Sequence, residues 1–316
     1  MKRCFTGRKL LLASAVSLVF PGLFAGDRAE GPSDFTIQSD VRLVLLDVSV
    51  KARDGNLVPG LAKEDFTVFE NGKPQPITVF AHDDVPVTVG ILVDESLSMT
   101  PKRPEVLVAA QAFVEESNPQ DEMFVLNFND KVTRGLPGEI LFSDNLKQLR
   151  SALYRGVPQG KTALFDAVID GLNQLQQGRR DKKTLVVISD GGDNASKHTR
   201  REMLELAERS IATVYAIGLY DAEDPDRSPG ILRQLARISG GEAYFPENKS
   251  AMTSICSRIA KDIRTRYTMG YIPQVTNGSG SLRRIHVQVS APGQARLSVR
   301  TRGSYHYDEI SKASKE

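Results

Sequence analysis

The sequence predicts an α/β fold, a doubly wound and mostly parallel sheet inserted in a small β-sandwich-like domain. From about residue 87 to residue 264, apolar runs alternate with segments of helical periodicity, which is typical of a sheet covered by helices. Strand-like segments with turn signals lie on both sides, at residues 40–85 and after residue 266. Neither flank has enough strands for a stable sandwich alone, so we expect the two to combine.

The central region is expected to alternate strands and helices. The strands expected from apolar and β-branched runs are at 87–93, 123–128, 184–189, 213–218 and 242–245, with a short one near Val132. The helices expected around them are at 104–117, 145–154, 162–177, 199–210, 229–239 and 249–264. Pro104 suits the first turn of its helix. The run at 184–189 is apolar almost throughout, which favours a strand buried on both faces.

The flanks are expected to form hairpins. In the first flank, after a strand at 41–50, Asn71-Gly72 gives the strongest hairpin signal and joins strands at 65–70 and 76–80. In the second flank, after a strand at 267–272, the segments 284–289 and 295–300 are expected to pair across Ala291-Pro292-Gly293.

The amino-terminal segment has the pattern of a Sec-type secretory signal peptide. Four basic residues precede an apolar run at 10–25 that is interrupted by Pro21. We expect cleavage near Ala25 and a secreted or periplasmic protein; an uncleaved membrane anchor is the alternative. The expected organisation is a signal peptide at 1–25, a flexible lead at 26–39, a first β-domain segment at 40–86, the α/β domain at 87–265, a second β-domain segment at 266–306 and a tail at 307–316.

Removal of the signal peptide changes what the composition implies. The loss of its four basic residues changes the formal net charge from +2 to −2, so nothing global favours a nucleic-acid partner. The mature chain is expected to have no membrane span. It keeps one cysteine, Cys256, and therefore no internal disulfide; a packed thiol is the expected role.

Oxygen-bearing side chains gather where predicted parallel strands end. Asp94, Ser96 and Ser98 follow the strand at 87–93, Asp190 follows the strand at 184–189, and Thr162 begins a helix. Because parallel strands present their carboxyl ends on one edge, we expect Asp94 and Asp190 on the same rim, within reach of Thr162. Hard oxygen donors suit Mg²⁺ or Mn²⁺ better than zinc.

This pattern resembles the metal-ion-dependent adhesion site of von Willebrand factor type A domains over residues 87–264. The flanks, with Gln75-Pro76-Ile77-Thr78-Val79-Phe80 and Gly270-Tyr271-Ile272-Pro273, look like secreted acidobacterial proteins related to that family. The resemblance implies direct metal binding by Ser96 and Ser98, direct or water-mediated binding by Thr162, and charge supplied largely through water by Asp94 and Asp190. It also implies that an Asp or Glu carboxylate of a protein partner completes the coordination. Leu97 stands where many relatives have glycine.

Other interpretations remain open at this point. Asp94, Ser96 and Ser98 alone are also compatible with an ordinary capped turn. The metal could serve only to stabilise a structural or envelope-assembly component. A metal-dependent hydrolase is a third interpretation, but the sequence has no nucleophile elbow, no phosphate-binding glycine loop and no histidine poised as a general base. We therefore expect a non-enzymatic binding module.

Overall fold

The structure is a computed structural model of the whole chain. It describes residues 43–219, 228–248, 251–274, 282–291 and 296–307. The predicted signal peptide, the flexible lead and most of the tail lie outside these residues. The chain divides into residues 1–39 and a compact unit that begins at Asp40, and everything below concerns this second unit.

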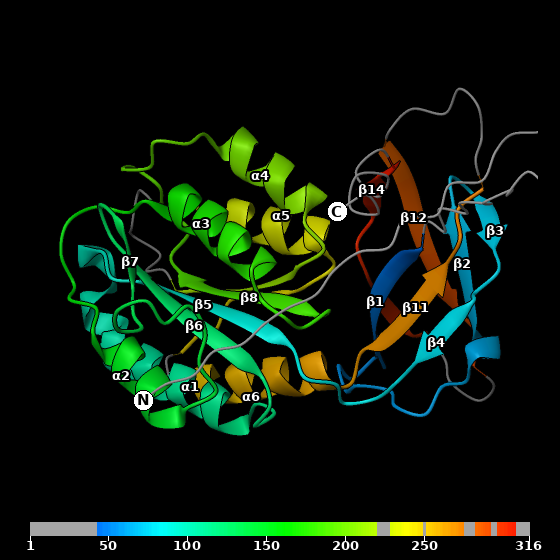
Figure 1. Cartoon of the computed structure of the whole chain (residues 1–316), viewed down its shortest axis with the longest axis horizontal. Coiled ribbons are helices and arrows are strands. Elements are labelled where there is room, and N and C mark those ends of the chain that lie inside the picture. The colour runs from blue at the N-terminus through cyan, green and yellow to red at the C-terminus, as the bar shows by residue number, and fades with distance from the viewer. Residues whose placement is uncertain (1–42, 220–227, 249–250, 275–281, 292–295, 308–316) are drawn as a thin grey trace, which may run out of the picture. The chain divides into compact units, whose positions relative to one another are not determined.

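A six-stranded sheet forms the centre of the α/β region (Figure 1), in the strand order β10-β9-β8-β5-β6-β7. All neighbours are parallel except β6 and β7. The strands are β5 (Thr88–Asp94), β6 (Glu122–Phe128), β7 (Val132–Arg134), β8 (Lys183–Ser189), β9 (Thr213–Gly218) and β10 (Ala243–Tyr244). Every residue of β5, β6 and β9 is buried, as expected for strands with helices on both faces.

The described residues include six α-helices, which cover the two faces of this sheet. Figure 1 shows α3, α4 and α5 on one face and α1, α2 and α6 on the other. The helices are α1 (Arg103–Glu116), α2 (Leu146–Tyr154), α3 (Leu164–Gln176), α4 (Arg200–Arg209), α5 (Pro229–Ser239) and α6 (Ala251–Arg264). Local signals fix several ends: Asn145 caps α2, Thr199 and Glu202 form a capping box on α4, and α5 stops at Gly240 in the left-handed conformation.

Two antiparallel four-stranded sheets form the β region. Their strand orders are β13-β1-β11-β4 and β14-β12-β2-β3. The strands are β1 (Val44–Lys51), β2 (Phe66–Glu70), β3 (Lys73–Gln75), β4 (Val79–Ala81), β11 (Tyr267–Tyr271), β12 (Leu282–Val289), β13 (Ser298–Arg300) and β14 (Ser304–His306), with a 3-10 turn, η1 (Lys63–Asp65), before β2. Both sheets contribute to one core, for example Leu46, Tyr267 and Val68. The fold class is therefore confirmed: an α/β fold with additional antiparallel sheets.

Two predicted hairpins are wrong in their pairing. β2 does turn back at Asn71-Gly72, but its partner is β3, whereas β4 at 79–81 pairs with β11 in the other sheet. The predicted pairing of 284–289 with 295–300 also fails, because β12 pairs with β2 and β14 while β13 pairs with β1. The apolar alternation marks a strand but not which of two facing sheets receives it.

The chain leaves and re-enters the β region at neighbouring strands. β4 precedes β5, β11 follows α6, and these two strands pair through Ala81 and Thr268. Buried polar contacts accompany the crossing: on α6, Asp262 accepts hydrogen bonds from Ser49 of β1 and Tyr215 of β9. In the described residues of the chain, no helix has both the length and the apolar character that a membrane crossing requires.

Candidate metal-binding site

The site begins where β5 and β8 end side by side. These strands pair in parallel with Val93 opposite Ile188, so their last residues, Asp94 and Ser189, reach the same edge of the sheet. Asp94 is buried; its Oδ1 accepts a 2.9 Å hydrogen bond from the backbone N–H of Ser96, and its Oδ2 accepts a 2.6 Å bond from Ser189 Oγ. These two bonds fix the carboxylate at the edge of the sheet.

The two serines and Asp190 form a continuous chain of contacts beside Asp94. Ser96 Oγ lies 3.1 Å from Ser98 Oγ, and Ser98 Oγ donates a 2.5 Å hydrogen bond to Asp190 Oδ2. The other oxygen, Oδ1, accepts a bond from Gly192 N. The serines lie at the start of η2 (Leu97–Lys102), a 3-10 turn that leads into α1. The structure thus brings Asp94, Ser96, Ser98 and Asp190 together.

A left-handed glycine turns the chain immediately after Asp190. Gly191 has φ +82°, and a Cβ there would lie 2.7 Å from the carbonyl oxygen of Ser228. Both the dihedral angle and the close backbone approach require glycine. The turn carries the chain from the end of β8 toward the segment that contains Asn194.

Thr162 lies beside the segment that follows Asp190. Its backbone N–H donates a 2.9 Å bond to Asn194 Oδ1, and its carbonyl oxygen accepts bonds from the N–H groups of Asn194 and Ala195. Its side chain is buried, and within the described residues its hydroxyl makes no hydrogen bond to the other four predicted ligands. The structure therefore links Thr162 to the Asp190 loop by its backbone.

Negative charge is concentrated and poorly solvated at this edge. Burial, together with the nearby charge of Asp190, raises the pKa of the Asp94 carboxyl to about 7, although hydrogen bonds from Ser189 and Ser96 oppose the shift. Loss of solvation and a neighbouring carboxylate both disfavour the ionised form of Asp94. A cation bound here would reverse that preference and stabilise the ionised Asp94 carboxylate.

The donor set fits a hard divalent cation. Two carboxylates and three hydroxyls supply only oxygen, as Mg²⁺ and Mn²⁺ prefer. No cluster of three or more His, Cys, Asp or Glu side chains suitable for a metal occurs among the described residues, so any metal site here depends on the hydroxyl groups. The residues that would hold the ion are Asp94, Ser96, Ser98, Thr162 and Asp190.

Two residues that support the site, Ser189 and Glu95, are absent from the sequence prediction. Ser189 holds Asp94 and is itself fully buried; its place directly before Asp190 at the end of an apolar strand was the available signal. Glu95 is also buried and pairs with Arg103 Nε at 2.8 Å. Asp193 Oδ2 accepts bonds from Phe165 N and Ser196 Oγ, so it caps the start of α3 next to Thr162.

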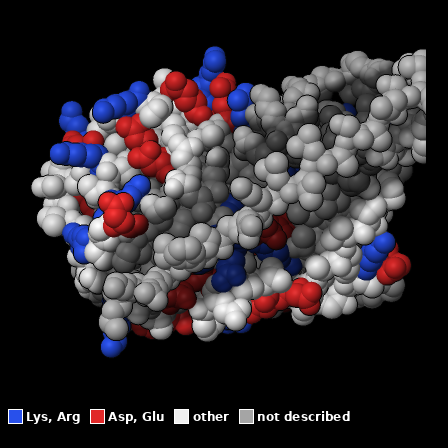
Figure 2. Space-filling view, in the orientation of Figure 1, with Lys and Arg blue, Asp and Glu red and all other residues white. Residues whose placement is uncertain are grey.

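On the face shown in Figure 2, the distribution of surface charge indicates no further binding site. Figure 2 shows basic and acidic side chains interspersed over the α/β region, with no extended field of one sign on that face. A single-sign basic surface is what a nucleic-acid-binding face would present. This view gives no support to such a function.

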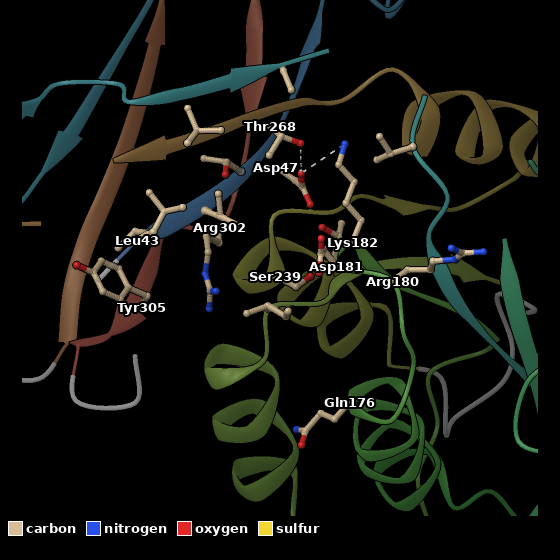
Figure 3. Close-up of a pocket in the computed structure, with 18 of the residues that line it drawn as sticks. Leu43, Asp47, Gln176, Arg180, Asp181, Lys182, Ser239, Thr268, Arg302 and Tyr305 are labelled. Carbon is tan, nitrogen blue, oxygen red and sulfur yellow. Dashed lines mark hydrogen bonds and ion pairs between the residues drawn. The ribbon is translucent and has the colours of Figure 1, made fainter. Parts of the chain in front are cut away.

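A large hollow lies at the opposite edge of the central sheet. It has a volume of about 1170 Å³ and is lined by the outer face of β1 and by residues at the amino-terminal ends of β8 and β9. Figure 3 shows Lys182 directed toward Asp47, 3.8 Å away, while Asp47 also accepts a bond from Thr268. These charged groups pair with one another, and the hollow contains none of the five candidate ligands.

Comparisons with known proteins support the fold. Residues 89–192 match the family model of the von Willebrand factor type A domain. The fold is von Willebrand factor A-like. A solved structure, a von Willebrand factor type A protein from Catenulispora acidiphila, aligns over 85% of this chain and 75% of its own length with a TM-score of 0.51 and 13% identity. At this identity the likeness concerns the fold.

Two further similar structures belong to pilus proteins. The von Willebrand domain of the type V pili tip protein Mfa5 from Porphyromonas gingivalis is 14% identical, with a TM-score of 0.47 over 61% of this chain and 99% of that one. The PilB minor pilin from Streptococcus sanguinis is 14% identical, with a TM-score of 0.45 over 61% and 64%. A search of curated proteins finds no significant match.

Proposed function

We propose that this protein is a secreted or periplasmic protein-binding module that depends on a divalent cation. Mg²⁺ or Mn²⁺ would bind at Asp94, Ser96, Ser98, Thr162 and Asp190, and an Asp or Glu carboxylate of a partner would complete its coordination. The contact chain from Ser96 through Ser98 to Asp190, beside the buried Asp94 carboxylate, carries the proposal.

The composition of the site explains why a bound cation would attract a third carboxylate. Only two of the five protein groups carry charge, and neutral hydroxyls withdraw little of the charge of a divalent ion. A hard cation with few anionic protein ligands keeps affinity for further oxygen donors. In this role the protein's residues position the oxygens, and the partner supplies the remaining one.

Binding is better supported than catalysis. A hydrolase that uses a metal needs a group to activate or accept a proton near the metal. His198 instead pairs with Asp166 at 2.7 Å, His82 stacks on Tyr267, and His286 packs near Phe69. Among the described residues, none of these three histidines takes part in the hydrogen bonds that join Asp94, Ser98 and Asp190 to their neighbours.

The extracytoplasmic setting is included in the proposal and rests on the sequence. Basic residues followed by the apolar run at 10–25 are the pattern of a secretory signal. The single cysteine of the remaining chain, Cys256, is buried and unpaired, so the fold is built without a disulfide.

A capture experiment tests the function. Wild-type protein and Asp94→Ala would be immobilised and exposed to an envelope extract of the source organism with Mg²⁺ or with EDTA. Asp84→Ala, in the segment between β4 and β5, is the matched control. The proposal predicts partner proteins that wild type and the control retain only with Mg²⁺ and that Asp94→Ala loses. Identical retention by all three proteins, or retention that EDTA leaves unchanged, would contradict it.

A further inference from the structure

Two large apolar side chains stand exposed at the rim of the candidate metal site. Leu97 lies between Ser96 and Ser98, yet it is 63% exposed whereas Ser96 is 2% exposed. Val157, in the loop after α2, is 62% exposed. Single exposed apolar residues are common on protein surfaces, so the position of Leu97 and Val157 decides whether they indicate a binding surface.

Hydrogen bonds hold the Val157 loop against the site. Gln159 N donates to the carbonyl oxygen of Glu95 at 2.9 Å, and Leu97 N donates to that of Gly160 at 3.3 Å. Arg103, the partner of Glu95, donates a 2.6 Å bond to the carbonyl oxygen of Gly156. The segments around Leu97 and Val157 therefore belong to one bonded rim, and their exposure is built into the fold.

Basic side chains flank the apolar ones on this rim. Arg155 and Lys161 are exposed, on either side of Val157 in the same loop, and neither side chain forms an ion pair with any described residue. The exposed acid beside them is Asp130, which accepts a bond from the backbone N–H of Lys161. Two exposed cations thus lie in the loop whose backbone is bonded to Glu95 and Leu97.

We propose that the site recognises an acidic protein segment that carries a large apolar residue next to its metal-binding carboxylate and a second acid nearby. The apolar residue would pack on Leu97 and Val157, and the second acid would meet Arg155 or Lys161. This inference rests on the proposed function and adds the chemistry of the partner: apolar contact and charge complementarity at the rim select among carboxylates.

A peptide panel tests the inference. Each capped octapeptide would have a central Asp, with Leu or Ser on one side of it and Glu or Lys on the other. A peptide with Asn in place of the central Asp would serve as the negative control. Binding to immobilised protein would be measured by biolayer interferometry with Mg²⁺ and with EDTA. The variants are Leu97→Ser and Lys161→Glu. The matched control is Ile211→Ser, because Ile211 is also 63% exposed but precedes β9 at the opposite edge of the sheet.

The inference predicts that the Leu/Glu peptide binds best to wild type. Leu97→Ser reduces the preference for Leu over Ser by about tenfold, as expected for loss of a leucine-sized contact. Lys161→Glu reduces the preference for Glu over Lys by about threefold, while Ile211→Ser keeps both preferences. Mg²⁺-dependent binding that is equal across the Asp peptides overturns this inference alone. Absence of Mg²⁺-dependent binding for every Asp peptide overturns the proposed function beneath it.

Discussion

The substitution Asp262→Ala is predicted to be among the most destabilising in the chain. Asp262 is buried on α6, where it accepts 2.5 Å hydrogen bonds from Ser49 Oγ and Tyr215 Oη, and Arg266 Nε lies 4.0 Å away. Burial alone would raise the pKa of this carboxyl, but Arg266, Lys51 and the two hydrogen bonds together hold it below its usual value of 3.8. The carboxylate is therefore ionised, and each of its two oxygens accepts a hydrogen bond.

The expected loss follows from what the substitution leaves behind. The Arg266 side chain is only 4% exposed. Removal of Asp262 leaves this buried guanidinium with hydrogen bonds to the neutral Thr213 and Gly240 groups but without its nearest carboxylate, at a cost of about 3–5 kcal/mol. The matched control is Asp84→Ala, which breaks a pair with Arg264, also on α6. That pair is 42% and 35% exposed, and surface pairs contribute about 0–1 kcal/mol.

Urea unfolding of both variants at neutral pH provides the measurement. Asp262→Ala should lower the free energy of unfolding by about 3–5 kcal/mol relative to wild type. Because folding lowers the pKa of Asp262, its carboxylate stabilises the fold at pH values above the unfolded-state pKa, and this stabilisation is lost as the pH falls through the folded-state pKa. The difference in free energy of unfolding between Asp262→Ala and wild type should therefore shrink in acid. A loss equal to that of Asp84→Ala would refute the reasoning.

Three other predictions concern the site and the core. The pKa of Asp94 in the metal-free fold is about 7, which is above its value in the unfolded chain, so this group destabilises the metal-free protein as the pH rises toward 7. Because Mg²⁺ must displace the proton from Asp94, the Mg²⁺ affinity measured by calorimetry should increase from about pH 6 to about pH 8. An unchanged affinity would contradict this. Burial raises the pKa of the Cys256 thiol to about 12, so a thiol reagent should label it only after unfolding; rapid labelling of the native protein would be inconsistent. Gly191→Ala should lower the free energy of unfolding by at least about 1–2 kcal/mol in urea titration, because of its positive φ; a neutral effect would argue against the turn.

The sequence predicted the fold class because its strongest signals are local. Apolar strands such as 184–189 and helices with clear caps, such as the one that Thr199 begins, specify their own conformation. The strand pairing in the β region was not predictable in the same way. β4 and β13 are three residues long, and the sheet that each joins depends on contacts with β11 and β1, far away in the sequence.

The candidate site was also only partly predictable from the sequence. Asp94, Ser96, Ser98 and Asp190 follow strands whose parallel pairing places their ends together, which a strand pattern predicts. The roles of Ser189 and of the pair between Glu95 and Arg103 depend on side-chain directions inside the fold. Those directions are set by packing between elements, and no short motif encodes them.

Calorimetric titration of the purified protein with Mg²⁺ tests the central claim most directly. Wild type, Asp94→Ala and Asp190→Ala would be compared with Asp130→Ala, which removes an exposed acid from the same rim. We predict a single binding event for wild type and for Asp130→Ala, and none for Asp94→Ala or Asp190→Ala. Equal Mg²⁺ binding by all four proteins, or no binding by wild type, would contradict the claim.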